Sequence, residues 1–589
     1  MLRHPRVRAG RDGRILHDNL AAVSHAGCVA ALDTANGRGV GTVRLREPRA
    51  ERDVGDGVSV GVDLADRRVY VDDEHRRHRA SGRGKGEQVG VVDTPPCGNE
   101  KSGPVETRHA AEHADRQTDA LIVIALTMRI WLASAVAGTA AASVAGGGVV
   151  TVSGPTPFSS CPDNAQTVVQ NAEVEPSLAV HPRRPARAYV AYQQDRFRDG
   201  AARGIVVATT TDGGRTWRRS VIGVGFCATG SRTPFRVTDP WVSVGADGRV
   251  YALASSSATT SSDGGAHWTA PVALTMPTAW TLPDKGSLTA DPVRAGIAYA
   301  VWARFVIPSR GPPVQSDAML AKTTNGGRTW SSPKVILPRG RDAGSIASVI
   351  VPDPRRSRLY HFAFWQVGVV PSVRRPGRLV VQSSSDGGAS WSPPRTIAQA
   401  YTVALASREA FSGNKIRTGF AVPSFAVDRR TGALYATWQD ARFSGRRFDQ
   451  IAFASSRNGG RTWSRPRRIS RPSVQAFVPV VAVAQAGTLG VAFYETAAGR
   501  SRHPTATRYV LATSRDGGRT FAPRKVGPTF DLAAAPLMQS VPELAVPPGL
   551  FLGDYMGIDA AANRFHLAFV TTNAARTNAT DVRYAVVNP

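Results

Sequence analysis

The chain has few of the residues on which metal centres and several enzyme classes depend. Among 589 residues there are only four cysteines and twelve histidines, and no HExxH motif is present, so the sequence predicts no metal site. No Gly-x-Ser-x-Gly motif indicates a nucleophilic serine. The glycine-rich run Gly82-Arg-Gly-Lys-Gly86 lacks the strand that precedes a phosphate-binding loop. We therefore expect neither a metal nor a cofactor.

Lysine is scarce too, although the chain is strongly basic. The formal net charge is +28, and only seven of the 73 basic residues are lysine. A charge of this size normally raises nucleic acid or an anionic surface as a partner. Here the basic residues do not cluster with aromatic side chains, and no nucleic-acid-binding motif is present. An arginine-heavy coding bias explains the charge better, so we expect no nucleic-acid partner.

One eight-residue phrase, in contrast, occurs six times. Each copy begins with Ser or Thr, continues with Asp or Asn and two glycines, and ends in an aromatic residue. The Asp or Asn side chain accepts hydrogen bonds from backbone N–H groups ahead of it, and the glycines supply positive φ. The aromatic residue is an apolar anchor between neighbouring sheets. We assign this structural role to Asp212, Asp263, Asn325, Asp386, Asn458 and Asp516, and to Trp217, Trp268, Trp330, Trp391, Trp463 and Phe521.

The phrase resembles the Asp-box, or bacterial neuraminidase (BNR) repeat, S/T-x-D-x-G-x-x-W/F. The chain therefore resembles the sialidase-like β-propellers of the neuraminidase superfamily. Gly553-Asp-Tyr-Met-Gly557 is similar to the terminal Gly-Asp-Tyr-x-Gly motif of secreted bacterial proteins of this type. The resemblance implies an all-β fold. It does not imply hydrolysis, because Asp-boxes also occur in propellers that hydrolyse nothing.

A second repeat indicates the number of blades. Seven units each contain an inner strand, a polar turn and a returning strand; the first begins at Pro176 and the last at Tyr555. We therefore predict a seven-bladed β-propeller of four-stranded antiparallel blades. A six-bladed sialidase propeller is the alternative. The last unit lacks one strand, and we expect residues 165–169 to supply it and close the ring.

The front of the chain does not match the rest. Residues 1–127 are rich in Arg, Asp, Gly and His and show no convincing strand periodicity. Residues 128–150 begin with a positive charge and continue with an apolar run and small residues, as in a secretory signal peptide. We expect translation to start at Met128 and the preceding stretch to be a gene-model artefact. The alternative is a disordered extension followed by a membrane anchor at 121–145.

This reading predicts a secreted, monomeric propeller over residues 160–589, free or associated with the cell wall. It would have no stable membrane span after signal cleavage. Only Cys161 and Cys227 follow Met128, and an exported protein with two cysteines favours a disulfide between them. Two unpaired thiols are the alternative.

Strand order predicts which face carries a site. In a four-stranded antiparallel blade the first-to-second and third-to-fourth turns share one face, and the repeated phrases are third-to-fourth turns. A site on the opposite face uses residues just before first strands or just after second strands. Those positions hold Glu173, Glu175, Arg236, Asp239, Asp284, Lys285, Asp554 and Tyr555, and Gln193, Gln194, Asp195, Arg196, Arg304, Gln366, Gln439, Asp440, Arg442 and Glu495. Such a ring suits a glycan or another cell-surface ligand, although Asp–Arg pairs also tie blades together.

The resemblance implies specific roles if the protein is a retaining sialidase. Such an enzyme needs three arginines for the substrate carboxylate, an Asp acid/base and a Tyr nucleophile activated by Glu. The catalytic candidates are Asp239, Tyr555, Glu495 and Asp554. The substrate-binding candidates are Arg236, Arg304, Arg442, Asp440, Glu175 and Asp195. The sequence Phe235-Arg236-Val departs from the Arg-Ile-Pro signature of sialidases.

Two functions therefore remain open. One is a sialidase-like glycoside hydrolase, an exo-α-sialidase by resemblance. The other is a non-catalytic propeller that binds glycans or proteins at the cell surface. The fourth and fifth phrases are the most widely spaced pair, which predicts an extra loop that contains Glu409.

Overall fold

The computed structural model divides the chain into two compact units, Met1–Ser143 and Val144–Pro589. In the first unit only strands up to residue 73 are described. Residues 148–589 are described apart from 162–167, 199, 226, 229–236, 279, 307–314, 341–342, 368–375, 404–415, 418–421, 498–504, 540–547 and 576. Among the described residues, no helix is long and apolar enough to cross a membrane.

The first unit contains short antiparallel strands. They are β1 (Arg8–Ala9), β2 (Ile15–Leu16), β3 (Leu20–His25), β4 (Cys28–Asp33), β5 (Arg38–Arg44), β6 (Val58–Asp63) and β7 (Arg68–Asp73). β3, β4 and β5 form a three-stranded sheet, and the others pair in twos. These strands do not test the origin of the segment, so its interpretation as a gene-model artefact stays a prediction.

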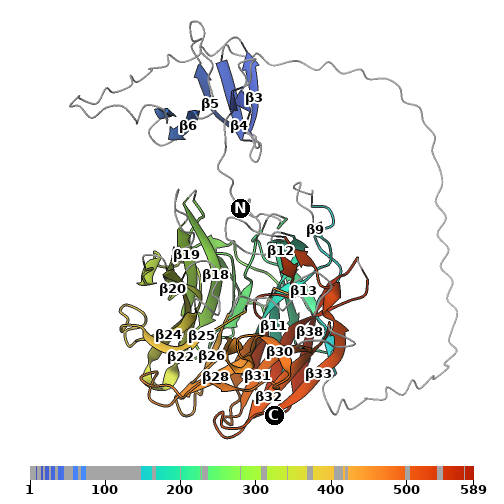
Figure 1. The fold of residues 1–589 in the computed structure, drawn as a ribbon. Coiled ribbons are helices and arrows are strands. Elements are labelled where there is room, and N and C mark those ends of the chain that lie inside the picture. Colours follow the sequence, from blue (N-terminus) through green and yellow to red (C-terminus); the bar gives the residue numbers. More distant parts are fainter. Residues whose placement is uncertain are drawn as a thin grey trace, which may run out of the picture. The chain divides into compact units, whose positions relative to one another are not determined.

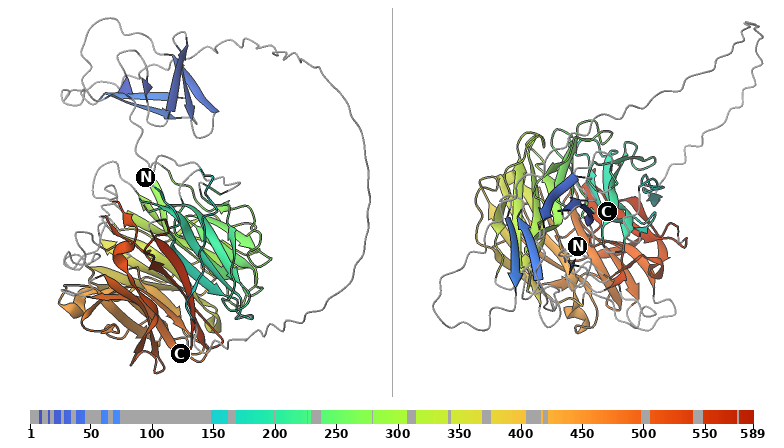
Figure 2. Two further views of the ribbon diagram at one scale, coloured as in Figure 1. Left: turned by 90° about the vertical axis from the view of Figure 1, so that its right-hand side faces the viewer. Right: turned by 90° about the horizontal axis from the view of Figure 1, so that it is seen from above.

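The second unit is a β-propeller of seven four-stranded antiparallel blades, which confirms the predicted fold and excludes six blades. Figures 1 and 2 show the blades following one another around the ring in sequence order. Blades 1 to 3 are β10 (Val174–Val180), β11 (Ala188–Phe197), β12 (Ala202–Thr210), β13 (Arg218–Val221); β14 (Trp241–Val244), β15 (Val250–Ala254), β16 (Ser257–Ser261), β17 (Val272–Ala273); and β18 (Thr281–Ala290), β19 (Ala298–Val306), β20 (Gln315–Thr323), β21 (Lys334–Leu337). Blades 4 to 6 are β22 (Ala343–Asp353), β23 (Arg358–Val367), β24 (Gly377–Ser384), β25 (Arg395–Ala400); β26 (Ser424–Val427), β27 (Leu434–Asp440), β28 (Gln450–Ser456), β29 (Arg467–Arg468); and β30 (Val474–Val483), β31 (Leu489–Ala497), β32 (Ala506–Ser514), β33 (Ala522–Asp531).

Blade 7 combines both ends of the propeller. It consists of β36 (Gly557–Ala561), β37 (Arg564–Thr572), β38 (Thr580–Val587) and, as its outermost strand, β8 (Val150–Thr151). The expectation that residues 165–169 supply this strand is wrong, because β9 (Val168–Val169) pairs with the end of β11 instead. Only residues 170–173 link β9 to the innermost strand β10. β8 pairs with β38 and protects the outer edge of blade 7.

Hydrogen bonds inside each repeated turn explain its composition. In the first turn Asp212 Oδ1 accepts from the backbone N–H groups of Arg215 (2.9 Å) and Thr216 (3.0 Å), and Oδ2 accepts from the Thr216 hydroxyl (2.6 Å). The Thr210 hydroxyl accepts from Gly214 N–H at 2.9 Å. In the sixth turn the equivalent bonds, led by the Thr520 hydroxyl, hold the pKa of Asp516 well below its usual range. These aspartates therefore serve to hold the turn.

The glycine pair and the closing aromatic residue connect neighbouring blades. Gly326 has a φ of 76°, and a Cβ there would lie 2.9 Å from Nε of Arg249 in the preceding blade. The ring of Trp217 in blade 1 packs edge-on against Tyr584 in blade 7, with centroids 5.0 Å apart. A small turn residue and a large anchor thus let adjacent sheets approach closely.

A disulfide joins Cys161 to Cys227, with Cα atoms 5.6 Å apart. It links the segment before blade 1 to the loop after β13. The apolar core lies between blades, as in the stacked pair Phe362 of blade 4 and Phe425 of blade 5, whose centroids are 4.4 Å apart.

Candidate functional site

The candidate site lies where several inner strands have a β-bulge near their first residues. The pairing of β10 with β11 skips from Val174 to Ser177, so that Glu175 and Pro176 have no partner in the ladder. β18, β22 and β30 contain the same irregularity. The bulged residues with positive φ are Glu175 (55°), Lys285 (49°), Ala347 (54°) and Val478 (52°), and Asp239, two residues before β14, has a similar φ (54°). A bulge re-aims its side chain away from the regular ladder.

These five residues with positive φ differ sharply in charge around the ring. Blades 1, 2 and 3 have Glu175, Asp239 and Lys285 there, whereas blades 4 and 6 have Ala347 and Val478. The blades that carry charge are neighbours, so their charged groups gather on one side of the channel.

Lys285 is the centre of that charged side. Its ammonium lies 2.9 Å from Asp239 Oδ1, 2.7 Å from Asp554 Oδ2 and 3.4 Å from Glu175 Oε1. Arg417 binds the same Asp554 oxygen at 3.0 Å. We call these five residues the Lys285 cluster. They come from blades 1, 2 and 3, from the segment before blade 7, and from the link between blades 4 and 5.

Further hydrogen bonds fix the carboxylates. Glu175 Oε2 accepts from the side-chain amide of Gln193 at 2.6 Å, and Oε1 accepts from Asp554 N–H at 3.1 Å. Asp239 Oδ2 accepts from Lys285 N–H at 3.1 Å. Arg417 is held by its backbone N–H, which donates to Leu550 of β35 (Gly549–Leu550) at 2.9 Å. The cluster is therefore rigid and pre-organised.

Burial separates the pKa values of the three carboxyl groups, which are at most 1% exposed. Burial raises the pKa of Glu175 and of Asp239 to about 7, against the opposing effect of Lys285. Burial also disfavours ionised Asp554, but Arg417 and Lys285 outweigh it and lower the pKa of that carboxyl to about 2. One site thus contains a carboxylate and carboxyls able to keep a proton near neutral pH.

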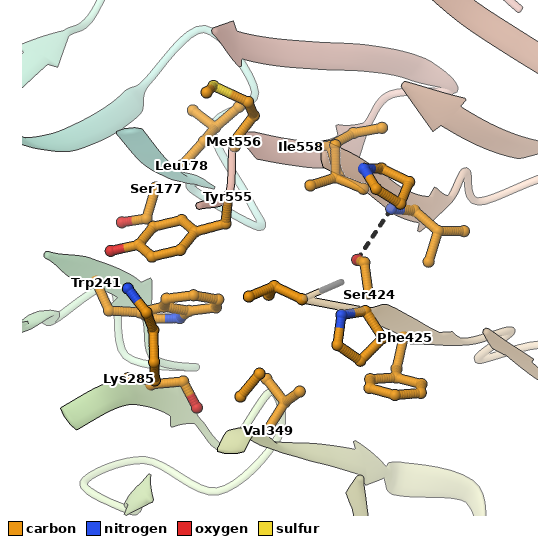
Figure 3. A pocket seen from close by; sticks show the side chains of 18 of the residues that line it. Ser177, Leu178, Trp241, Lys285, Val349, Ser424, Phe425, Tyr555, Met556 and Ile558 are labelled. Atoms are coloured by element: carbon orange, nitrogen blue, oxygen red, sulfur yellow. Dashed lines mark hydrogen bonds between the residues drawn. The ribbon is translucent and has the colours of Figure 1, made fainter. Parts of the chain in front are cut away.

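A mostly apolar cavity of about 170 Å³ adjoins the cluster inside the channel. Inner-strand residues of all seven blades line it, and Figure 3 shows Lys285, Trp241 and Tyr555 on one side and Ser424, Phe425 and Ile558 on the other. The rings of Trp241 and Tyr555 lie 5.4 Å apart. The Tyr555 hydroxyl donates to the Pro240 carbonyl at 2.9 Å, and burial raises the pKa of Tyr555 well above its usual value.

Of the catalytic and substrate-binding candidates from the sequence, the structure brings four together: Glu175, Asp239, Asp554 and Tyr555. The others make ion pairs elsewhere. Arg304 pairs with Asp317 (2.8 Å), Arg442 with Asp440 (2.8 Å), Asp195 with Arg203 (3.3 Å), and Glu495 with Arg508 (2.7 Å) and Arg471 (3.1 Å). Arg236 and Glu409 lie outside the described residues.

Sequence reasoning missed Arg417 and Trp241. Arg417 belongs to the extra loop predicted between the fourth and fifth phrases, but nothing in the sequence connects it to Asp554. Trp241 could have been found, because it follows Pro240 as Ser177 follows Pro176 at the start of blade 1. Among the described residues, no group of His, Cys, Asp and Glu is placed to hold a metal ion.

No protein-family model and no curated protein sequence matches the chain. Among solved structures, a Hadza microbial sialidase, Hz136, is 16% identical with a TM-score of 0.37; the match covers 71% of this chain and 66% of that one. A PL25 ulvan lyase bound to -[GlcA(1-4)Rha3S]- is 11% identical, with a TM-score of 0.44 and coverage of 72% and 96%. An α-L-arabinanase of Penicillium chrysogenum, complexed with arabinobiose, is 12% identical, with a TM-score of 0.37 and coverage of 60% and 93%. This chain thus spans about two thirds of the length of the sialidase, and similarity at this level does not identify an activity.

Proposed function

We propose that this propeller acts on glycans and hydrolyses a glycosidic bond at the Lys285 cluster. The observation that carries the proposal is the placement of three buried carboxyl groups around one ammonium, two with a raised pKa and one with a lowered pKa. Environments that push neighbouring carboxyl groups apart in pKa assign one to the acid role and another to the base role.

The cluster supplies both roles. Asp554 stays ionised and acts as the base or nucleophile, while the Glu175–Asp239 pair keeps a proton for the leaving oxygen. Because both Asp239 and Asp554 contact the Lys285 ammonium, their nearest oxygens are at most about 6 Å apart, a limit that includes the separation of about 5–5.5 Å in retaining glycosidases. Trp241 offers an aromatic surface beside them.

Non-catalytic glycan binding is the second candidate, and one observation favours it. Every carboxyl of the cluster already accepts hydrogen bonds from protein donors, and all three are buried. Such a network also serves simply to shape a binding site.

The structure gives less support to an exo-α-sialidase reaction than to glycoside hydrolysis in general. It requires a tyrosine nucleophile in contact with a glutamate, whereas the Tyr555 hydroxyl donates to a backbone carbonyl. It also requires arginines that converge on one anion, whereas Arg304 and Arg442 bind carboxylates of their own blades. Secretion or attachment to the cell wall, and a monomeric state, complete the proposed setting.

A fluorogenic glycoside panel tests the proposal on the full chain. We expect hydrolysis of at least one glycoside and a loss of about 100-fold or more in kcat/KM for Asp554→Asn, the scale of losing an acid–base group. Asp317→Asn is the matched control, because Asp317 also binds two cations, Arg304 and Arg339. Glycan binding without turnover would favour the second candidate, and neither binding nor turnover would refute both.

A further inference from the structure

The Lys285 cluster contains more acidic than basic groups. Glu175, Asp239 and Asp554 face two cations, Lys285 and Arg417. A fourth carboxylate, Asp284, accepts from Lys285 N–H at 2.9 Å. Even when Glu175 and Asp239 share one proton, three negative charges face two cations, so a ligand that enters this site meets an excess of negative charge.

We propose that the site takes a neutral or amino sugar that carries a small apolar substituent, and that it rejects sugars bearing a carboxylate or sulfate. The inference rests on the proposed function and specifies its substrate class.

Buried acceptors without a hydrogen-bond donor support the binding of a neutral or amino sugar. Asp554 Oδ1 and Gln193 Oε1 are buried and have no hydrogen-bond partner among the described residues. A buried acceptor without a donor is costly, so a ligand that brings donors is favoured. Hydroxyl and ammonium groups are donors, whereas a carboxylate or sulfate offers only acceptors.

Electrostatics supports the rejection of anions. Like charges in contact repel strongly in a buried site, because the effective dielectric constant is far below that of water. Lys285 and Arg417 offset this repulsion only in part, because their two positive charges face three negative ones even when Glu175 and Asp239 share a proton.

The channel cavity supports the apolar substituent. Its wall is mostly aliphatic and aromatic, including Leu178, Val349 and Phe425. A volume of about 170 Å³ is comparable to that of an engineered apolar cavity that binds benzene. Two hydroxyls in the wall, Ser177 and Ser348, have no hydrogen-bond partner among the described residues, so a substituent with one polar atom also fits.

Matched synthetic glycosides test the inference. Phenyl and methyl β-glycosides of glucose, glucosamine and glucuronate, with their galacto counterparts, are titrated into the full chain by calorimetry. In the series that binds, we expect the uronide to bind about 100-fold more weakly than the neutral sugar, or worse. We expect the phenyl glycoside to bind about tenfold more tightly than the methyl one.

Two variants separate the causes. At pH 9, where Glu175 and Asp239 are both ionised, Asp239→Asn removes one negative charge and should reduce discrimination against the uronide, while Asp317→Asn, outside the cluster, should not. Val349→Phe fills the cavity and should abolish the phenyl advantage while methyl glycosides still bind; their binding also shows that the variant is folded.

The outcomes are distinguishable. A uronide that binds as tightly as the neutral sugar would overturn the inference and leave the glycan function intact. Equal binding of phenyl and methyl glycosides would overturn the assignment of the channel. If no glycoside binds and none is hydrolysed, the proposed function itself fails.

Discussion

Replacing Lys285 with methionine removes a cation that contacts all three carboxylates of the cluster, at 2.7 to 3.4 Å. Methionine keeps most of the apolar stem, so the change is mainly electrostatic. Removing one partner of a buried ion pair costs about 3–5 kcal/mol, because the remaining charges are left uncompensated. We expect a loss of that size in the free energy of unfolding at pH 8.

The loss should depend on pH with a defined sign. The folded-state pKa values of Glu175 and Asp239, about 7, exceed the ordinary values of Glu and Asp. Between the ordinary pKa values and about 7, the folded state therefore binds more protons than the unfolded chain. The stability that these groups contribute is lost as pH rises through 7. Without Lys285 their pKa values rise further, and the deficit of the variant should shrink between pH 8 and pH 5.

Denaturant unfolding followed by tryptophan fluorescence measures the effect. Lys322→Met is the control, because Lys322 lies 5.6 Å from the Tyr299 ring centroid and donates to the Gly387 carbonyl, contacts worth about 1 kcal/mol. Equal losses in the two variants, or a deficit at Lys285 that is the same at pH 5 and pH 8, would refute the charge argument.

Three other predictions follow from the fold. Gly518→Ala should destabilise the propeller by about 1 kcal/mol more than Gly213→Ala in thermal unfolding. Both glycines have positive φ, but only a Cβ at Gly518 would overlap a buried ring, that of Phe453 in the preceding blade; equal losses would contradict the proposed packing. Reducing the disulfide between Cys161 and Cys227, which spans 66 residues, should cost about 2–4 kcal/mol and lower the melting temperature, and an unchanged melting temperature would count against that role. N-terminal sequencing of the native protein should find no peptide from residues 1–120 if translation starts at Met128, whereas any such peptide would rule the artefact out.

Position in the β-ladder explains why several candidate residues do not reach the site. Arg304 stands opposite Asp317 in the pairing of β19 with β20, and Glu495 stands opposite Arg508 in the pairing of β31 with β32. Opposite charges at facing positions bind each other, so those side chains are engaged within their own blade. These pairs could have been predicted from the register of each hairpin.

Glu175 and Lys285 escape such pairing because they occupy bulges and have no partner in the ladder. The repeats predicted the number of blades, and they placed Glu175 and Lys285 just before inner strands. They could not predict that Arg417 reaches Asp554, because that contact joins segments 137 residues apart. The closing strand was mispredicted for a similar reason, since strand spacing alone does not tell which edge a short strand meets.

The strained backbone at the bulges belongs to the scaffold, and the ligand site arises from the side chains placed on it. Positive φ at a non-glycine residue is costly and often accompanies function. Here, however, φ is nearly the same at Lys285 (49°), which centres the cluster, and at Val478 (52°), whose branched side chain gains no ion pair. If strain marked the site, every blade with a bulge would contribute to it. Instead, identical backbone geometry presents charge on adjacent blades and apolar groups across the channel, so the differences between repeats locate the site.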